Sequence, residues 1–479
     1  MDDVKTRRPR NPRPGTRDQI TIGGVPAQEL ASAYGTPLYV IDAGKVRENY
    51  ATLSSAFGRH YRKTRIYYAE KANTNIALLR LLRELGSRVD VVSIGELRAA
   101  GLAGFSGNEI LFTSGSVNEE EAREVIRSGA LFNIDSTSIY EKVMQIGLPS
   151  IISFRFNPGI GAGHHEHCVT GSPASKFGMA QEENDHSLER LYLDAREHGV
   201  KRFGIHMHIG SGITETKPYA EAMDRLFALI RNLDAAGIRF EFIDIGGGIG
   251  IAYKPDEKVP SIGEIGEAIA REFAARVKES LDYEPELFIE PGRSIIANAG
   301  YLLARVNCIK KAAGKNYAIV DGGINVLMRP VLYGSYHHIR VDGKRGLESR
   351  VLSLESRVPR PEDMKTAQQR GRLEDQWRTS AAAREDLKTS KPETRDSKLI
   401  TYDIVGPMCE SGDFLGRERK LPIIAEGDLI VVENAGAYGF TMANNYNSHP
   451  LPAEVMAENG KHRLIRRRQT YEQLFENCE

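Results

Sequence analysis

The stretch RIYYAEK, residues 65–71, is the first of eight short runs that are rich in β-branched and aromatic residues. The other seven runs are RVDVVS, EILFT, LFNID, IISFRFN, RFGIHMH, FEFIDI and ELFIE, which start at Arg88, Glu109, Leu131, Ile151, Arg202, Phe240 and Glu286. Between them lie longer segments of helical period, such as NIALLRLLRELG, which end on glycine where helices commonly close. Eight such units in about 225 residues predict an α/β fold, a (β/α)8 barrel of the TIM type. A doubly wound sheet stays open as an alternative, because a count of strands does not fix their order.

After Pro291 the pattern changes to short strands that are separated by frequent turns, as in NYAIVDGGIN and DLIVVENAGAYG. We therefore predict a C-terminal, mainly β domain over residues 301–479 and a barrel over residues 36–300. Residues 1–35 are expected to be a tail followed by a segment that joins the β domain. Residues 340–398 are densely charged and show little apolar periodicity, which predicts a solvated insertion in the β domain.

Composition narrows the class of protein. A hydrophobic share of 41% with 27% charged residues is typical of a globular chain, and 64 basic residues balance 64 acidic ones, so nothing favours a nucleic-acid partner. No apolar stretch approaches the roughly 20 residues that cross a bilayer, and the first residues lack the apolar core of a secretory signal. Four scattered cysteines indicate a reducing compartment rather than a disulfide framework. We expect a cytoplasmic protein without a membrane partner.

Polar residues stand at the ends of four of the eight predicted strands, where barrel enzymes build their active sites. Lys71 ends the first run, His206 and His208 end the sixth, the glycines at 246–248 follow the seventh, and Glu290 follows the eighth. We expect these four strand ends to converge on one site.

For each of these residues, a purely structural role is an alternative to a role in catalysis or binding. A lysine after an apolar, aromatic strand can lose its proton and form an imine with an aldehyde, although Lys71 could equally be a rim lysine in a salt bridge. The glycines Gly246, Gly247 and Gly248 leave backbone amides uncovered where barrels commonly hold phosphate, although they would also suit a tight turn. The stretch GGGIGIAY lacks the third glycine of a dinucleotide fingerprint.

Two groups of histidines raise the question of a metal. His206 and His208 are two residues apart on a strand and so face the same way, a spacing that metal sites also use. The cluster HHEHC at residues 164–168 matches no metalloprotease spacing and is interpreted as a polar active-site loop. We predict no metal.

Glu290 and Arg293 in EPGR, taken alone, would be a surface ion pair. Pyridoxal phosphate, however, needs a lysine for its aldehyde, amides for its phosphate, a flat partner for its ring and an acid for its pyridine nitrogen. The strand ends offer all four, so we predict pyridoxal 5'-phosphate as the cofactor. An acid at Glu290 would keep the pyridine protonated, which favours decarboxylation over racemisation.

The motifs resemble those of the diaminopimelate decarboxylases, pyridoxal-phosphate enzymes that join an alanine-racemase-like barrel to a β domain. They are YYAEKAN, DVVS, NPGIGAGHHEH with SKFG, HIGSG, GGG, EPGR, RPVLYGSYH, GPMCESGD and ENAGAYG, in the family's order over nearly the whole chain. The resemblance implies that Lys71 is the imine lysine and that His208 stacks on the ring. The further cofactor contacts that it implies are Ser211, Gly246, Gly247, Gly248, Glu290, Pro291, Gly292, Arg293 and Tyr438.

The same resemblance implies the reaction and the substrate contacts. The reaction is decarboxylation of meso-2,6-diaminopimelate to L-lysine and CO2, in lysine biosynthesis. Cys409 is implied as a second catalytic residue beside Lys71, and it would come with Glu410 from the partner subunit of a homodimer with shared active sites. The substrate-binding residues implied are Arg293, Arg329, Tyr333, Glu410 and Tyr438.

Three departures from the family pattern leave alternatives open. Ile94 stands where the family usually has glycine, and Gly212 replaces a common glutamine after HIGS. The third departure is the insertion at 340–398, which is read either as an inert surface loop or as a lid or regulatory contact. The alternatives are a decarboxylase of another basic amino acid, such as ornithine, arginine or carboxynorspermidine, and a non-catalytic cofactor-binding homologue.

Overall fold

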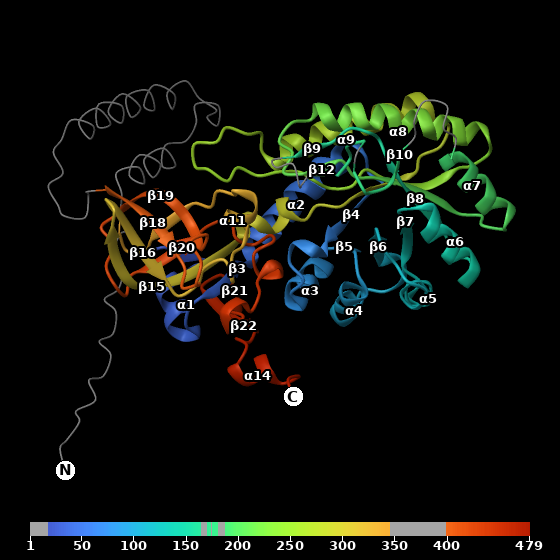
Figure 1. The fold of residues 1–479 in the computed structure, drawn as a ribbon. Coiled ribbons are helices and arrows are strands. Elements are labelled where there is room, and N and C mark those ends of the chain that lie inside the picture. Colours follow the sequence, from blue (N-terminus) through green and yellow to red (C-terminus); the bar gives the residue numbers. More distant parts are fainter. Residues whose placement is uncertain (1–17, 164–169, 174, 181–186, 345–398) are drawn as a thin grey trace, which may run out of the picture.

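The computed structural model describes residues 18–163, 170–173, 175–180, 187–344 and 399–479. Two bodies lie side by side, a barrel wrapped by helices and a domain built mainly of sheet (Figure 1). The predicted insertion at 340–398 falls almost wholly outside the described residues, as does the histidine cluster at 164–168. In the described part of the chain, no helix is both long and apolar enough to span a membrane.

The barrel consists of eight parallel strands in chain order, and its first and last strands pair to close it. They are β4 (Thr64–Ala69), β5 (Arg88–Val91), β6 (Ile110–Ser114), β7 (Leu131–Ile134), β8 (Ile152–Asn157), β11 (Phe203–Met207), β13 (Phe240–Asp244) and β14 (Glu286–Ile289). Each corresponds to one of the eight runs found in the sequence, so the predicted barrel is confirmed and the doubly wound alternative is wrong. Three short strands border the barrel mouth: β9 (Ala162–Gly163), β10 (Met179–Ala180) and β12 (Gly210–Ser211).

Helices cover the outside of the barrel. They are α2 (Ala43–His60), α3 (Ile76–Glu84), α4 (Ile94–Ala103), α5 (Glu119–Ser128), α6 (Thr137–Ile146), α7 (Ser187–Glu197), α8 (Lys217–Ala235) and α9 (Ile262–Ser280). Local sequence explains where they begin and end. In α5, for example, Asn118 and Glu121 form a reciprocal capping box, and the helix closes at Gly129 with a left-handed φ of 72°.

The barrel interior has two layers, because side chains two residues apart on a strand point to the same side. The lower layer is apolar and holds Tyr67, Leu111, Leu131, Ile151, Phe242 and Phe288. The rings of Phe242 and Phe288 stack at 4.2 Å, and Gly204 gives them room, since a Cβ there would lie 2.1 Å from the Phe242 ring. The layer above is polar and buried, with Asp90, Thr113, Asn133, Ser153, His206, Asp244 and Glu290. This polar layer is the floor of the site described below.

The second domain is a large sheet in the order β19-β18-β16-β15-β3-β21-β22, with β20 paired to both β15 and β17. The strands are β3 (Leu38–Asp42), β15 (Gly300–Ala312), β16 (Lys315–Val320), β17 (Ile339–Val341), β18 (Leu399–Val405), β19 (Phe414–Pro422), β20 (Leu429–Val432), β21 (Ala453–Glu458) and β22 (Lys461–Arg466). The small elements are β1 (Thr21–Ile22), β2 (Val25–Pro26), α1 (Ala27–Tyr34), α10 (Arg293–Ile296), α11 (Arg329–Tyr333) and α14 (Tyr471–Phe475). The expected mainly β domain is therefore present.

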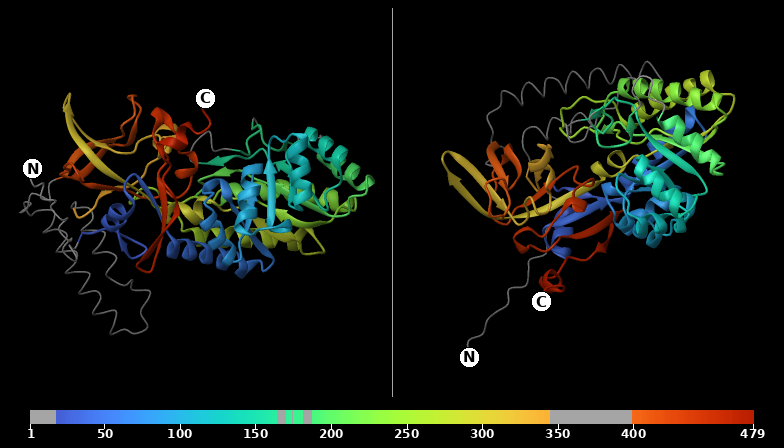
Figure 2. Two further views of the ribbon diagram at one scale, coloured as in Figure 1. Left: turned by 90° about the horizontal axis from the view of Figure 1, so that it is seen from below. Right: turned by 45° about the vertical axis from the view of Figure 1, so that its right-hand side comes forward.

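Strand β3 lies within residues 36–300, the stretch expected for the barrel, yet it pairs with β15 and β21 of the sheet. Because β3 and β15 are neighbours, the whole barrel is inserted between two adjacent strands of the sheet domain. Figure 2 shows the two bodies from below and from the side, with β3 in blue among the yellow and red strands. Arg340 and Val341, at the start of the predicted insertion, belong to β17.

Candidate active site

Lys71 lies on a single 3-10 turn, Glu70–Ala72, directly after β4. Its Nζ donates to Oδ2 of Asp90 on β5 at 2.5 Å, and Asp90 is fully buried while the lysine side chain is 36% exposed. Burial lowers the pKa of Lys71, but the carboxylates of Asp90 and Glu290 outweigh burial and raise it above its ordinary value. Asp90 is therefore the nearest acceptor for the proton that Lys71 must lose before it can act as a nucleophile.

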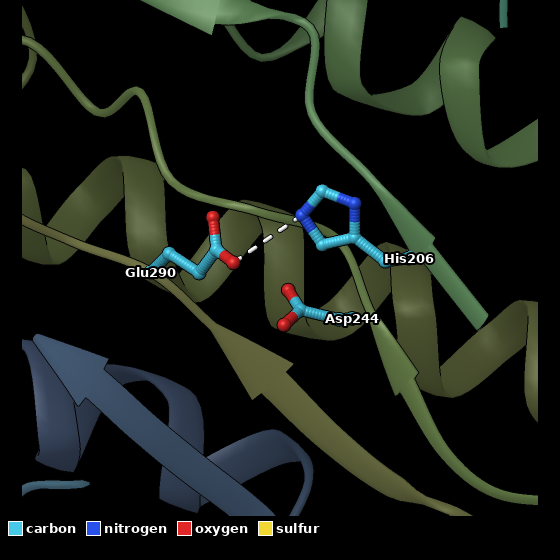
Figure 3. A group of neighbouring side chains, drawn as sticks. All are labelled: His206, Asp244 and Glu290. Carbon is cyan, nitrogen blue, oxygen red and sulfur yellow. Dashed lines mark ion pairs between the residues drawn. The ribbon is translucent and has the colours of Figure 1, made fainter. Parts of the chain in front are cut away.

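A buried cluster of His206, Asp244 and Glu290 lies in the polar layer (Figure 3). His206 Nε2 is 3.2 Å from Glu290 Oε1, and one ligand atom of each residue lies within 4.8 Å of the others. Burial raises the pKa of Glu290, but His206 and Lys71 outweigh it, so the pKa is held below its ordinary value and Glu290 is a carboxylate. The spacing would also suit a metal ion, so the absence of a metal stays a prediction.

His208 follows β11, and the glycine loop fixes its ring. The backbone N–H of Gly247 donates to His208 Nδ1 at 3.2 Å. Burial lowers the pKa of His208 to about 3, so the ring is neutral. The loop has no room for side chains, since a Cβ on Gly247 would lie 1.9 Å from the carbonyl oxygen of Glu290, and Gly248 has a left-handed φ of 98°.

Arg293, at the start of α10, contacts two further residues that were predicted to bind the cofactor. Its Nη2 donates to Ser211 Oγ at 3.1 Å, and its guanidinium lies 5.0 Å from the ring centre of Tyr438. Tyr438 comes from the sheet domain, and its backbone N–H donates to the carbonyl of Ala72 at 2.8 Å, beside Lys71. The structure therefore brings Ser211, Arg293 and Tyr438 together.

Pro291 and Gly292 connect Glu290 to Arg293 and pack against the lysine turn. Ala69 N–H donates to the Pro291 carbonyl at 3.3 Å, and a Cβ on Gly292 would lie 3.0 Å from Cβ of Ala72. The predicted residues from four strand ends thus surround one space.

This space fits pyridoxal phosphate. Asp90, Asp244 and Glu290 are three buried acids around Lys71, and Asp90 Oδ1 and Asp244 Oδ2 have no hydrogen-bond partner among the residues that the structure describes. Burial, the larger cause, and the charge of Glu290, the smaller one, raise the pKa of Asp244 well above its ordinary value. Asp244 is therefore a neutral acid beside the Glu290 carboxylate. The concentration of acids suits a protonated ring nitrogen, and the side lined by the glycine loop, Ser211 and Arg293 suits a phosphate.

A cavity of about 530 Å³ adjoins the site, and Arg329, Tyr333, Tyr253 and Gly212 are among the residues that line it. Arg329 is 1% exposed; its Nη1 donates to His337 Nε2 at 3.1 Å, and its Nη2 has no hydrogen-bond partner in the described chain. Burial, followed by Arg329, lowers the pKa of His337 to about 3, so His337 is a neutral acceptor. A buried guanidinium with no carboxylate partner is suited to an anionic ligand group.

Cys409 and Glu410 lie on the loop between β18 and β19, and both are exposed. Cys409 contacts Tyr446 and Asn447 of the same domain. Neither Cys409 nor Glu410 lines the cavity that Arg329 and Tyr333 line within the described chain. Of the predicted substrate-binding residues, Arg329 and Tyr333 line this cavity, whereas Glu410 lies with Cys409 on the exposed loop.

The strand ends and the family motifs did not single out Asp90, Asp244, Tyr253 or Asn447. A period-two count along the strands would have found the first two. Asp244 lies two residues beyond Phe242 of the lower layer, and Asp90 lies two residues beyond Arg88, whose guanidinium lies 5.5 Å from the ring centre of Tyr67. Ile94 begins α4 and packs against the barrel core, and Gly212 has a left-handed φ of 79° at the cavity wall.

Comparison with known proteins agrees with this geometry. Residues 43–297, more than half of the chain, match the family model "Pyridoxal-dependent decarboxylase, pyridoxal binding domain". Residues 368–436 match the model "Pyridoxal-dependent decarboxylase, C-terminal sheet domain". Fold and matches together define the class as a pyridoxal-dependent decarboxylase, in which a barrel is joined to a sheet domain.

Individual relatives narrow the class. Diaminopimelate decarboxylase of Methanothermobacter thermautotrophicus is 40% identical over 461 residues, which covers 96% of this chain and 95% of the relative. The enzyme of the same name from Neisseria meningitidis is 35% identical, covering 95% of each chain. The crystal structure of diaminopimelate decarboxylase from M. jannaschii in complex with L-lysine has a TM-score of 0.80 at 31% identity, covering 97% of this chain and 96% of that one. The chain therefore belongs to the diaminopimelate decarboxylase family.

Proposed function

We propose that the protein decarboxylates meso-2,6-diaminopimelate to L-lysine and CO2 with pyridoxal phosphate as cofactor. The observation that carries the proposal is the buried guanidinium of Arg329, whose Nη2 has no hydrogen-bond partner in the described chain. Arg329 lines the cavity together with Tyr253, which is hydrogen-bonded to Arg293. Diaminopimelate has a second carboxylate at its far end, which would meet this guanidinium. A substrate without that carboxylate would leave the charge of Arg329 unbalanced.

Lys71 is the covalent anchor of the cofactor, and Asp90 takes the proton that Lys71 loses. When bound, pyridoxal phosphate supplies an electron sink for the pair left behind by the departing carboxylate. The Glu290 carboxylate holds a proton on the ring nitrogen. His206 holds the Glu290 side chain in place from 3.2 Å.

The other cofactor contacts serve the ring face and the phosphate. His208 is neutral because it is buried. The hydrogen bond from Gly247 N–H to His208 Nδ1 fixes the ring, so that its flat face is presented to the cofactor. The Gly248 amide, Ser211 Oγ and the Arg293 guanidinium would donate to the phosphate oxygens. The amides of Gly246 and Gly247 donate instead to Asp244 Oδ1 and His208 Nδ1, so these two glycines shape the loop. Pro291 and Gly292 shape the turn between Glu290 and Arg293, and Tyr438 closes the site from the sheet domain.

At the substrate end, Arg329 and Tyr333 bind the far carboxylate, and Glu410 binds the far ammonium. Arg293 and Tyr438 contact the substrate where it meets the phosphate side. Cys409 delivers a proton to the substrate carbon after CO2 leaves, and Lys71 is the alternative donor. Cys409 and Glu410 act across a homodimer interface, since they are exposed on one chain and do not line its own cavity.

The experiment is lysine release from meso-diaminopimelate by the purified protein, with and without added pyridoxal phosphate. We expect one CO2 per lysine and dependence on the cofactor. Ornithine, arginine and carboxynorspermidine are tested in parallel, each of which lacks the pairing of an amine and a carboxylate on one distal carbon. Turnover of one of these in preference to diaminopimelate would overturn the substrate assignment, and no turnover of any would favour a non-catalytic homologue.

A further inference from the structure

The loop that carries Cys409 is held firmly within a single chain. Asp413 Oδ2 accepts from Met408 N at 2.7 Å, and Asp413 Oδ1 accepts from Ile324 N at 2.7 Å. Burial raises the pKa of Asp413, and the hydrogen bonds from these two amides partly offset that rise. Gly323 packs on this carboxyl group, where a Cβ would lie 2.0 Å from Oδ1. One chain therefore supplies the contacts that hold the backbone on either side of the Cys409 loop.

Asn447 contacts Cys409 at two points. Its Oδ1 accepts from the backbone N–H of Cys409 at 3.0 Å, and its Nδ2 donates to Cys409 Sγ at 3.1 Å. Asn447 has φ 51° and ψ 28°, the left-handed conformation that asparagine tolerates better than most residues. The turn thus presents one side-chain amide to both the backbone and the sulfur of the cysteine.

Tyr446 does not compete for this role. Its hydroxyl donates to Glu410 Oε2 at 3.4 Å and lies 3.8 Å from Cys409 Sγ. Because a hydroxyl has one proton to donate, a Tyr446 that donates to Glu410 leaves the Asn447 amide as the donor to the sulfur. The amide of Asn447 is therefore the group that fixes the direction in which the sulfur points.

We propose that Asn447 is the positioning residue of Cys409: Oδ1 fixes the loop backbone, and Nδ2 orients the sulfur. The inference rests on the proposed function in one respect, namely that Cys409 takes part in the reaction. The two claims are tested by separate measurements.

The first measurement is the rate of alkylation of Cys409 by iodoacetamide at fixed pH in the full-length holoenzyme, followed by peptide mass spectrometry. The exposed Cys478 in the same molecule serves as an internal reference. Asn447→Gly keeps the left-handed turn and removes the amide, and Asn447→Asp keeps the acceptor for the Cys409 backbone but removes the donor. Since both variants lose the hydrogen bond that orients the sulfur, we expect both to slow alkylation of Cys409 about tenfold relative to Cys478.

The matched control is Ser448→Gly, which relaxes the next residue of the same turn, at φ 58°, without touching the amide. It should leave the Cys409 rate unchanged. A second readout is the division between kcat and KM: Asn447→Gly and Asn447→Asp should lower kcat about tenfold and leave KM within about twofold.

The outcomes separate the two claims. If alkylation of Cys409 is unchanged in both Asn447 variants, the positioning role is wrong, whatever happens to activity. If Cys409→Ala keeps full activity while Asn447→Gly slows alkylation, the positioning role stands and the catalytic role of Cys409 is lost.

Discussion

Glu70 directly precedes Lys71, and its carboxyl group is buried. Its side chain is 0% exposed, and neither carboxyl oxygen has a partner in the described chain. Burial, followed by Glu96 and Asp90, raises the pKa of Glu70 to about 9. Glu70 is therefore a neutral acid at pH 7, and it would carry a charge at that pH in the unfolded chain.

This shift gives a stability prediction with a defined sign. The folded state binds the Glu70 proton more tightly, so the stability that it contributes is complete below about pH 4.5 and is lost as the pH rises towards 9. Glu70→Gln removes this loss of stability. Between pH 6 and 8, the free energy of unfolding of the variant minus that of wild type should therefore increase by on the order of 1 kcal/mol for each pH unit. Urea unfolding at several pH values measures it. Glu84→Gln on the surface is the control, and a parallel pH dependence of Glu70→Gln and wild type would refute the prediction.

Lys71→Ala should remove the covalent attachment of the cofactor, because no other amine contacts Asp90 in the described chain. Wild-type protein is expected to be yellow, and borohydride should fix the cofactor to a peptide that contains Lys71. The variant should lose this label together with at least about a thousandfold in kcat. Lys63→Ala, an exposed lysine just before the same strand, should keep both. A labelled peptide containing another lysine would contradict the assignment.

Among the elements, the loop between β13 and α9 links the phosphate side of the site to the substrate cavity through Tyr253. The Tyr253 hydroxyl accepts from Arg293 Nη1 at 2.6 Å. The same ring lies 5.1 Å from the Arg329 guanidinium and packs edge-on against His337. The two arginines that we propose to bind the substrate, Arg293 and Arg329, therefore both contact the Tyr253 side chain.

Tyr253→Phe deletes the hydroxyl and keeps the ring, so Arg293 loses a hydrogen bond while Arg329 keeps its neighbour. We expect KM for diaminopimelate to rise about three- to tenfold with a smaller change in kcat. Tyr253→Leu should raise KM further, because both arginines lose the ring. Tyr283→Phe removes a hydroxyl that accepts from Phe240 N at the start of β13 and should change neither constant. Equal KM values for Tyr253→Phe and wild type would count against the link.

The barrel strands could be predicted because each is buried on both faces, which leaves a continuous apolar run that local sequence records. The local sequence of a strand does not indicate which other strand it pairs with. LYVID at Leu38–Asp42 has the same composition as a barrel strand, and only its pairing with β15, more than 250 residues later, places it in the other domain. Asn447 was missed for the same reason, since 38 residues separate it from Cys409. Lys71, His208 and Glu290 could be predicted because strand ends of a barrel converge by geometry.

On the scale of the whole molecule, the insertion of the barrel between β3 and β15 fixes the two domains to each other at their junction. Asn49 on α2 donates to the Ile295 carbonyl at 2.8 Å, and Gly436 approaches Gly300 so closely that a Cβ on Gly300 would lie 2.1 Å from its Cα. The sheet domain therefore delivers Tyr438 to its own barrel. Cys409, by contrast, is exposed on the same domain and has no contact with Lys71 in the described part of the chain. For this reason we propose that Cys409 acts on the site of a second chain.

This arrangement predicts complementation between two damaged proteins. Lys71→Ala and Cys409→Ala should each be nearly inactive, because every site in either homodimer lacks one of the two residues. Random reassociation makes half of the dimers mixed, and each mixed dimer has one site with both residues intact and one with both lost. Activity should therefore recover to about a quarter of wild type, as the symmetry of a two-site dimer requires. Mixing without dissociation is the control and should restore nothing. If dissociation and reassociation also restore nothing, Cys409 does not act on the partner's site, and both residues must belong to sites built from a single chain.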